Sequence, residues 1–216
     1  MAKHFNLSDD KLPERIPLFP LRDTVLLPGG DLPLNMFEPR YRAMTQWAMS
    51  TNRIIGMIQP HNKDGDLYAI GCAGRITQFQ EVDDGRYLIT LHGVSRFTLK
   101  HKQITSDHYW LGDVDWSDFT ADRQNSCALP NHLTRDHIKP LLQRFMDKHD
   151  LAIDWDQAAH IPDERFYALL SMVAPFSAAE KQALLESIDF PTRCTLLVEL
   201  LQMAISNPTS QHPVLH

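Results

Sequence analysis

Histidine is the side chain most often used both for metal binding and for proton transfer, and this sequence contains eleven of them. They are scattered over 216 residues without an HExxH or HxH pattern, the spacings that bring two imidazoles to one metal ion. His132 and Asp136 have the i, i+4 spacing of one helix face, but two ligands do not make a metal site. We therefore expect this chain to bind no metal ion and no cofactor.

The three cysteines, Cys72, Cys127 and Cys194, are widely spaced and form no CxxC pair. A reactive thiolate needs a neighbouring cation or a helix N-terminus to lower its pKa. Cys72 lies among small residues in the run IGCAG and Cys194 on the apolar face of a predicted helix, so we expect both thiols to be buried and inert. Cys127 falls in a predicted linker. An odd, dispersed set predicts no disulfide framework and indicates a reducing, cytoplasmic setting.

Acidic pairs and nucleotide-binding loops give no catalytic pattern either. Asp83 and Asp84 belong to a predicted turn, and Asp113 and Asp115 alternate outward around Val114. The chain has no Gly-Lys dipeptide, and hence no Walker A loop, and it contains neither GxGxxG nor GxSxG. The sequence therefore predicts a protein that is not an enzyme by itself.

The charge balance bears on the kind of partner. The net charge is −6, both halves are mildly acidic, and no dense run of Lys and Arg occurs, whereas proteins that bind nucleic acid usually carry a basic patch. The N-terminal residues lack the apolar segment of a secretory signal. No apolar run approaches the roughly 18 residues of a membrane span, so we expect no membrane contact.

The predicted secondary structure that positions these side chains changes near residue 118, from strands before it to helices after it. From Arg15 to about Trp116, short extended runs alternate with Pro, Gly and Asp, which is typical of a β-rich domain. In the run that begins at Tyr87, alternating apolar residues predict a strand with one buried face. The preceding DDGR segment predicts a hairpin turn, because Gly85 can adopt a positive φ.

One helix interrupts the strands. Pro39 fits its first position, where the missing N–H costs nothing, and Glu38 fits an extended cap. Asn35 and Glu38 form an alternative capping box, which would place Pro39 one turn inside the helix. The apolar residues that recur along one face are Phe37, Tyr41, Met44 and Ala48.

The last part of the chain is helical. Its first helix carries apolar residues from Leu133 to Met146, and Pro140 predicts either a kink or the start of the helix. The apolar stripe of its last helix is so broad that the helix is either enclosed or available to a partner. The three later helices are predicted over residues 165–174, 178–188 and 192–205.

A longer motif is more specific than any of these patterns. Residues 16–42 read IPLFPLRDTVLLPGGDLPLNMFEPRYR, which closely resembles the opening of the N-terminal substrate-binding domain of Lon proteases. The resemblance continues with IGCAGRI, with GRYLITLHGVSRF and, in the helical half, with APFSAAEKQALLESIDFPTRCTLLVELL. From these matches, which span residues 16–201, the chain is identified as a stand-alone member of the family without ATPase or protease domains.

The resemblance implies an α+β fold in two parts. A PUA-like, six-stranded antiparallel β-barrel would carry the inserted helix, and a helical subdomain of about four helices would follow. A Ser-Lys protease dyad is not carried over, because its domain is not present in the matched region. The implied divisions are a flexible N-terminus (1–14), a PUA-like β subdomain (15–118), a linker (119–128), a helical subdomain (129–206) and a tail (207–216).

Several motif residues are expected to shape the backbone and the core. Pro17 and Pro20 predict that the first strand lies at a sheet edge, because proline cannot donate to a ladder. Gly29 and Gly30 predict a turn that needs a positive φ. Phe37 and Tyr41 are expected in the core.

The charged motif residues are expected to form ion pairs. Glu38 can cap the first helix and pair with Arg42 one turn later. Arg22, Arg75 and Arg96 are expected to lock strands to that helix. The motif residues interpreted as structural are Pro20, Arg22, Pro28, Gly29, Phe37, Glu38, Pro39, Arg40, Tyr41 and Arg42.

The leading hypothesis is a non-enzymatic module that binds protein or peptide. By resemblance it would recognise exposed apolar segments of other polypeptides or a protease partner, which requires an apolar surface patch of roughly several hundred Å². The alternative is RNA binding, since PUA-like barrels occur in RNA-modifying systems, and the acidic charge balance argues against it. The candidate peptide-contacting residues, near the junction of the halves, are Met44, Trp47, Trp110, Phe119 and Trp155.

Overall fold

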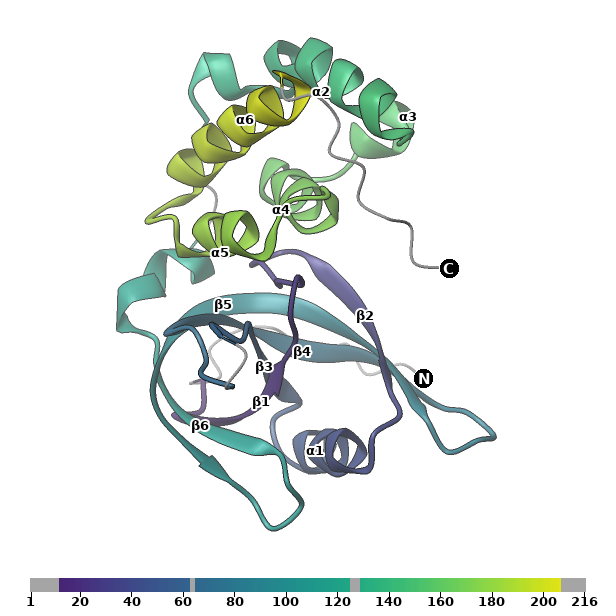
Figure 1. The fold of residues 1–216 in the computed structure, drawn as a ribbon, viewed down its shortest axis with the longest axis vertical. Helices are drawn as coiled ribbons and strands as arrows, with labels where there is room; N and C mark the ends of the chain where they lie inside the picture. The colour runs from purple at the N-terminus through teal and green to yellow at the C-terminus, as the bar shows by residue number, and fades with distance from the viewer. Residues whose placement is uncertain (1–11, 63–64, 125–128, 207–216) are drawn as a thin grey trace.

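The computed structural model describes residues 12–62, 65–124 and 129–206. Within these residues a β-barrel with one helix packs against a group of helices, which is the predicted α+β architecture (Figure 1). The strands are β1 (Arg15–Pro20), β2 (Asp31–Met36), β3 (Ile54–Ile58), β4 (Ile70–Glu81), β5 (Tyr87–Ile104) and β6 (Trp110–Asp115), and helix α1 (Pro39–Ser50) connects β2 to β3.

The six strands form one sheet that closes on itself. Their order is β2-β5-β4-β3-β1-β6, and β6 pairs again with β5. Closure is possible because β5 is 18 residues long: its first half lies between β2 and β4, and from Thr98 onward it pairs with β6. The fold class is as predicted, with one difference. Strands β1 and β3 run parallel, and β2 and α1 supply the crossover that a parallel pair needs.

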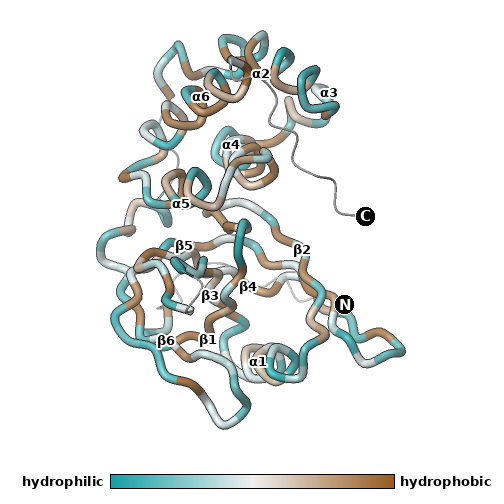
Figure 2. Tube along the Cα trace, viewed as in Figure 1, coloured by the Kyte–Doolittle hydropathy of each residue, from teal (hydrophilic) through white to brown (hydrophobic). Residues whose placement is uncertain are grey.

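Strand β1 does not lie at a sheet edge, contrary to the prediction from its prolines. It pairs with β6 over Arg15–Leu18 and with β3 over Leu18–Pro20. Because the two pairings are staggered, Pro17 and Pro20 each face a neighbouring strand on one side only. Strands β1 and β3 are almost wholly buried, and Figure 2 shows their hydrophobic residues in the middle of the barrel.

The β4–β5 hairpin turns at DDGR, as predicted. Gly85 has φ +78°, and its N–H donates to the Val82 carbonyl (2.8 Å). A β-bulge shifts the register of β4 between Ile76 and Gln78. The hairpin extends beyond the body of the barrel (Figure 1), so its outer side chains lie at the surface.

Helix α1 begins at Pro39, as predicted. Glu38 is extended (φ −67°, ψ 135°), so the alternative capping box with Asn35 does not form. The predicted face of the helix is buried in the barrel, and its apolar members are Tyr41, Met44 and Ala48.

Two predictions for the start of this helix are wrong. Phe37 is 63% exposed, because Met36 takes the inward position at the end of β2 and the next side chain turns outward. Glu38 pairs with Arg40, with 2.8 Å between Oε2 and Nη2, and Arg42 lies against an aromatic ring of β5 instead.

The helical part contains the four predicted helices and a single-turn helix that was not predicted. Pro140 lies inside the first helix and marks neither of its ends. A second core includes Phe145, Tyr167 and Leu197. Within the described ranges, no helix is both long and apolar enough to cross a membrane. The helices are α2 (Arg135–His149), α3 (Trp155–Ala158), α4 (Asp163–Val173), α5 (Ala178–Glu186) and α6 (Phe190–Ser206), with 3₁₀ turns η1 (Ser117–Arg123) and η2 (Asn131–Leu133) before them.

The barrel and the helices share one core and a buried polar network. Ala168 of α4 and Leu185 of α5 pack into the core of the barrel. Gln59, directly after β3, donates through Nε2 to Gln182 Oε1 of α5 (3.1 Å), and Gln182 donates to the Ile70 carbonyl (3.1 Å). Such buried hydrogen bonds fix the orientation of the helices, because breaking one leaves a polar group without a partner.

Arg96 of β5 carries a charge into this junction. Its guanidinium pairs with the carboxylate of Asp122 in η1, with 2.8 Å between Nη2 and Oδ1, and both side chains are buried. Arg96 Nη1 also donates to the carbonyls of Leu185 (3.1 Å) and Ser187, at the end of α5. Arg96 therefore joins the barrel to the helical part, whereas the prediction joined it to the first helix.

Arg22 and Arg75 form no ion pair with another described residue, so that prediction is wrong for both. Arg22 donates to the Asn62 carbonyl (3.4 Å), and Arg75 donates to the Asn52 carbonyl (3.2 Å). These two carbonyls belong to the loops on either side of β3, which the arginines hold in place.

Candidate functional site

The five residues predicted to contact a peptide do not share a surface. Met44 is fully buried on the inner face of α1. Phe119 is also buried, with the Arg96 guanidinium 4.3 Å from its ring centre. Trp47, Trp110 and Trp155 are half-buried, on α1, β6 and α3 respectively. Helices α1 and α3 lie at opposite ends of the molecule (Figure 1). The surface available to a partner must therefore be sought elsewhere.

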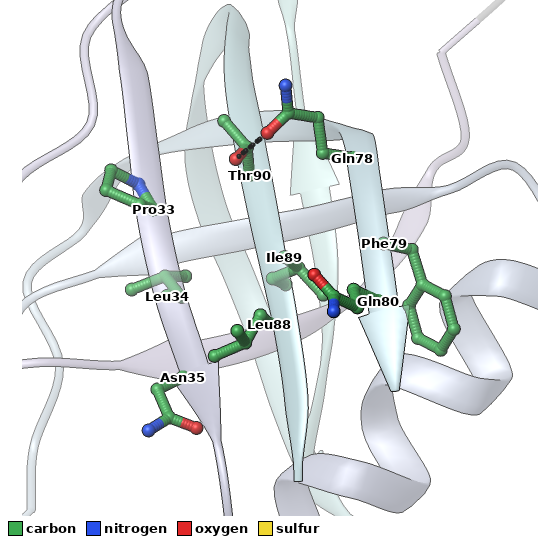
Figure 3. A pocket seen from close by; sticks show the side chains of 9 residues that line it. All are labelled: Pro33, Leu34, Asn35, Gln78, Phe79, Gln80, Leu88, Ile89 and Thr90. Atoms are coloured by element: carbon green, nitrogen blue, oxygen red, sulfur yellow. Dashed lines mark hydrogen bonds between the residues drawn. The ribbon is translucent and has the colours of Figure 1, made fainter. Parts of the chain in front are cut away.

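A shallow hollow lies instead over three neighbouring strands, β2, β5 and β4, where the hairpin leaves the barrel. Its volume is about 570 Å³. The nine residues that line it, shown in Figure 3, are Pro33, Leu34, Asn35, Gln78, Phe79, Gln80, Leu88, Ile89 and Thr90.

Six uncharged side chains lie together on the outer side of these strands, over the hollow. Leu88 and Thr90 point outward from β5, because the alternate residues of its first half are buried. Residues paired directly across two strands project on the same face, and the register pairs Leu88 with Asn35 and Gln80, and Thr90 with Pro33 and Gln78. We call these six residues the outer sheet face: Pro33, Asn35, Gln78, Gln80, Leu88 and Thr90.

The outer sheet face offers hydrogen-bonding groups around an exposed apolar side chain. Leu88 is 40% exposed. Thr90 Oγ1 donates to Gln78 Oε1 (3.0 Å; Figure 3). The side-chain amides of Asn35 and Gln80 make no hydrogen bond with any other described residue. A side-chain amide both donates and accepts. The face can therefore make an apolar contact and hydrogen bonds to neutral groups at the same time.

One end of the outer sheet face is anchored to the helical part through Asp31. The Asp31 carboxylate accepts a hydrogen bond from Arg165 Nη2 of α4 (2.7 Å), and its other oxygen lies 2.8 Å from His92 Nδ1 of β5. Strands β2 and β5 are thereby tied to each other and to α4, which keeps this end of the face in a fixed position.

The other end is supported by aromatic packing on α1. The Tyr87 ring lies 5.1 Å from the Phe79 ring, and its hydroxyl is hydrogen-bonded to Gln46 of α1 (2.5 Å). The Arg42 guanidinium lies over the same ring at 5.3 Å. Arg42, a residue of the family motif, therefore supports the hairpin.

The loop that contains Pro28 and Gly29 packs closely on β5. Of the two glycines of the predicted turn, Gly29 has the positive φ (+78°) and Gly30 does not, and the Gly29 N–H donates to the Gly93 carbonyl (2.9 Å). A Cβ atom at Gly93 would lie 2.0 Å from the Leu27 carbonyl oxygen. This close approach positions the chain as it enters β2.

The buried cysteines are not placed for chemistry. Cys72 and Cys194 are both fully buried, as predicted. Burial raises the pKa of the Cys194 thiol to about 12 and raises the pKa of Cys72 further. Neither thiol therefore ionises near neutral pH. Cys127 lies outside the described residues, within which no three His, Cys, Asp or Glu side chains are grouped as metal ligands.

The sequence predictions did not select the outer sheet face. The alternation that begins at Tyr87 predicted one apolar side, and Leu88 and Thr90 belong to the opposite side. Strand β4 gave no comparable apolar alternation. Gln78 and Gln80 lie beside Thr90 and Leu88 because the hairpin register runs without a shift from the turn to Gln78.

The comparisons with known proteins identify the class. The model of the ATP-dependent protease La (LON) substrate-binding domain family matches residues 15–203, so the chain belongs to this family. It is 24% identical over 212 residues to Lon protease 2 of Myxococcus xanthus, covering 93% of this chain and 25% of that protein. It is 28% identical over 200 residues to the Lon protease of Elusimicrobium minutum, covering 88% of this chain and 24% of that protein.

Solved structures agree with this assignment. A Lon N-terminal domain protein from Xanthomonas campestris is 26% identical with a TM-score of 0.60, covering 87% of this chain and 97% of that chain. The N-terminal domain of the Mycobacterium avium complex Lon protease shares the fold at 16% identity, with a TM-score of 0.61, covering 89% of this chain and 98% of that one. The chain spans about a quarter of the length of its curated relatives. Its family membership supports the role of a substrate-binding module.

Proposed function

We propose that the protein binds exposed apolar segments of other polypeptides and that the outer sheet face is the surface that contacts them. The observation that supports this most directly is the exposed Leu88 among uncharged amide and hydroxyl groups, over a hollow of about 570 Å³. A polypeptide segment presents apolar side chains together with neutral amide donors and acceptors, so it matches this combination of groups.

The composition of the hollow favours a polypeptide over RNA. None of its nine lining residues is Lys or Arg, so none of them can neutralise a phosphate. The only aromatic side chain among the nine, Phe79, packs against Tyr87 and supports the hairpin. Phe79 is 42% exposed, but no cation in the lining accompanies it, whereas RNA binding combines stacking with phosphate contacts.

The contact that a face of this size allows is small. Specific, stable protein–protein interfaces bury about 1,200–2,000 Å² of total surface, and smaller ones belong to weak, transient complexes. We therefore expect dissociation constants in the micromolar range or weaker, with rapid release. Such affinity suits a module that samples many unfolded segments, because the recognition depends on side-chain type more than on one sequence.

The test is the binding of a carboxymethylated, permanently unfolded protein, measured by fluorescence anisotropy. We expect saturable binding, and Leu88→Asp should weaken it about tenfold or more because it places a charge in the middle of the apolar contact. Ile104→Asp is the matched control, since Ile104 is 55% exposed on the same strand but does not line the hollow. No saturable binding, or an equal loss in both variants, would overturn the proposal.

A further inference from the structure

Strand β2 forms the border of the outer sheet face and is paired on one side only. It pairs with β5 at all six of its positions, from Asp31 with His92 to Met36 with Tyr87. Among the described residues, no strand pairs with its opposite edge. In Figure 1 this edge lies on the side of the barrel from which the β4–β5 hairpin extends.

The hydrogen bonds next to β2 show which of its backbone groups point to the open edge. The Gly93 N–H donates to the Gly30 carbonyl (2.8 Å), which is one of the two bonds of a hydrogen-bonded pair; the Gly30 N–H donates to the Leu27 carbonyl instead (3.0 Å). In an antiparallel ladder such pairs alternate with pairs whose backbone N–H and carbonyl groups point away from each other. Leu32, Leu34 and Met36 therefore bond to β5, and the residues between them point their backbone groups outward.

The hydrogen bonds between β5 and β4 lead independently to the same assignment of which β5 residues bond to β2. The Val82 N–H donates to the Arg86 carbonyl (3.0 Å) at the end of the hairpin, so the next hydrogen-bonded pairs with β4 are those of Leu88 and Thr90. The alternate residues of β5 are then left to bond with β2, as the assignment from Gly93 requires.

The open edge therefore presents a short series of unpaired backbone groups. The N–H groups of Asp31 and Asn35 and the carbonyls of Asp31, Pro33 and Asn35 point away from β5. Pro33 occupies a position where no N–H is needed by the ladder, which is where a strand tolerates proline. Successive outward residues are about 6.8 Å apart, the spacing at which an extended chain places its own bonding groups.

We propose that an extended segment of a bound polypeptide pairs with the open edge of β2 and adds a strand to the sheet. This inference rests on the proposed function, because it specifies how the segment that contacts the outer sheet face is held. Backbone bonds would supply affinity that is independent of sequence, and alternate side chains of the segment would extend the apolar and amide surface beside Pro33 and Asn35.

The same edge is poorly suited to a second copy of this chain. When two β2 strands are centred on each other, Pro33 faces Pro33, and the middle pair makes no hydrogen bond because neither residue has an N–H. An unrelated segment loses only the one bond that would have come from Pro33. The edge therefore accepts a short foreign strand while the proline limits self-association.

Amide hydrogen exchange measured by NMR tests the proposal on the unaltered chain. The probe is a short peptide of alternating Thr and Val, added to saturation. We expect exchange at the Asp31 and Asn35 amides to slow by about tenfold or more, and exchange at Leu32 and Leu34, which are already bonded to β5, to change little. Unchanged exchange at Asp31 and Asn35 with bound peptide would overturn the proposal.

Two peptide variants and two chain variants separate the backbone bonds from the side-chain contacts. N-methylation of one alternate set of peptide amides should abolish binding, whereas N-methylation of the other set should leave it. Asn35→Pro and Asn35→Ser both remove the side-chain amide, but only Asn35→Pro also removes an outward N–H, so it should weaken binding clearly more than Asn35→Ser. Equal binding of both methylated peptides contradicts the edge pairing.

The failures of the two proposals are distinguishable. Binding that is lost in Leu88→Asp but leaves the Asp31 and Asn35 amides unprotected refutes the added strand and leaves the proposed function standing. No binding of any unfolded polypeptide refutes the proposed function itself. Protection of these amides in the free protein, together with a doubled mass in solution, would show self-pairing and would also refute the inference.

Discussion

Asp122→Asn should be among the most destabilising conservative substitutions in this protein. The Asp122 carboxylate accepts hydrogen bonds from Arg96 Nε (2.9 Å), from Arg96 Nη2 (2.8 Å) and from the Arg96 backbone N–H (2.9 Å). The Arg193 guanidinium is also buried nearby, where desolvation and the charge of Arg96 lower its pKa to about 10, and Asp122 partly offsets this effect. The substitution therefore leaves two buried cations without their buried counter-ion.

The expected cost follows from the burial of the pair. Side-chain exposure is 1% for Arg96 and 7% for Asp122, so water cannot replace the lost carboxylate. Removing one partner of a buried ion pair typically costs about 3–5 kcal/mol. A domain of this size is stable by about 5–15 kcal/mol, so about a fifth or more of its stability would be lost. The melting temperature should fall by about 6–20 °C, at about 2–4 °C for each kcal/mol.

The assay is urea unfolding followed by circular dichroism, with Asp113→Asn as the matched control. Asp113 also pairs with an arginine, Arg15, with 2.5 Å between Oδ1 and Nε, but both side chains are largely exposed. The control removes the same single negative charge from a pair that water screens, so it should cost much less stability than Asp122→Asn. If Asp122→Asn costs no more than Asp113→Asn, the buried pair does not hold the two parts of the molecule together and the reasoning is refuted.

Three further predictions follow from close packing, from a helix cap and from buried thiols. Gly93→Ala should destabilise the protein by about 1–3 kcal/mol or more in urea unfolding, because the new Cβ would lie 2.0 Å from the Leu27 carbonyl oxygen. Asp189→Ala should cost about 0.5–2 kcal/mol at neutral pH, because the Asp189 carboxylate accepts the Thr192 N–H (2.8 Å) at the start of α6. Cys72 and Cys194 should resist iodoacetamide in the native protein and react after unfolding in guanidinium, as read by peptide mass mapping.

The cap at Asp189 also predicts a pH dependence. Hydrogen bonds from Thr192 lower the pKa of Asp189 below its usual value, so the ionised carboxylate is favoured in the folded state. Its contribution is fully present above the unfolded pKa of about 3.9 and is lost as the pH falls through the folded pKa. The stability difference between wild type and Asp189→Ala should therefore shrink in acid. Asp189→Asn should retain the cap, and its stability should lack this pH-dependent contribution.

The predictions for Gly93→Ala and for the two buried cysteines have controls of their own. Gln80→Ala alters an exposed side chain of the same sheet and should change stability by no more than about 0.5 kcal/mol. A Gly93→Ala protein as stable as this control would contradict the close approach of the Leu27 loop. Alkylation of either buried cysteine without unfolding would show that the junction or the helical core opens readily.

Local features were predictable because neighbouring residues determine them. Pro39 begins α1 through its fixed φ and missing N–H, and Gly85 turns the hairpin through its positive φ. Cys72 is buried as its small neighbours indicated. Phe37 was wrongly assigned to the core because the pattern counted it with the helix, whereas in the structure it follows β2 and obeys the alternation of a strand.

The sequence by itself determined the family and the α+β class, because the motif over residues 16–42 and the later matches are read directly along the chain. Only the tertiary structure decided that Arg96 joins the barrel to the helices and that Leu88 lies beside Asn35 and Gln80. Arg96 and Leu185, like Asn35 and Leu88, are far apart in sequence, so only the strand pairing and the packing of α5 on the barrel decide that they meet. The open edge of β2 depends on the same pairings, because an edge exists only once every other strand has found its neighbours.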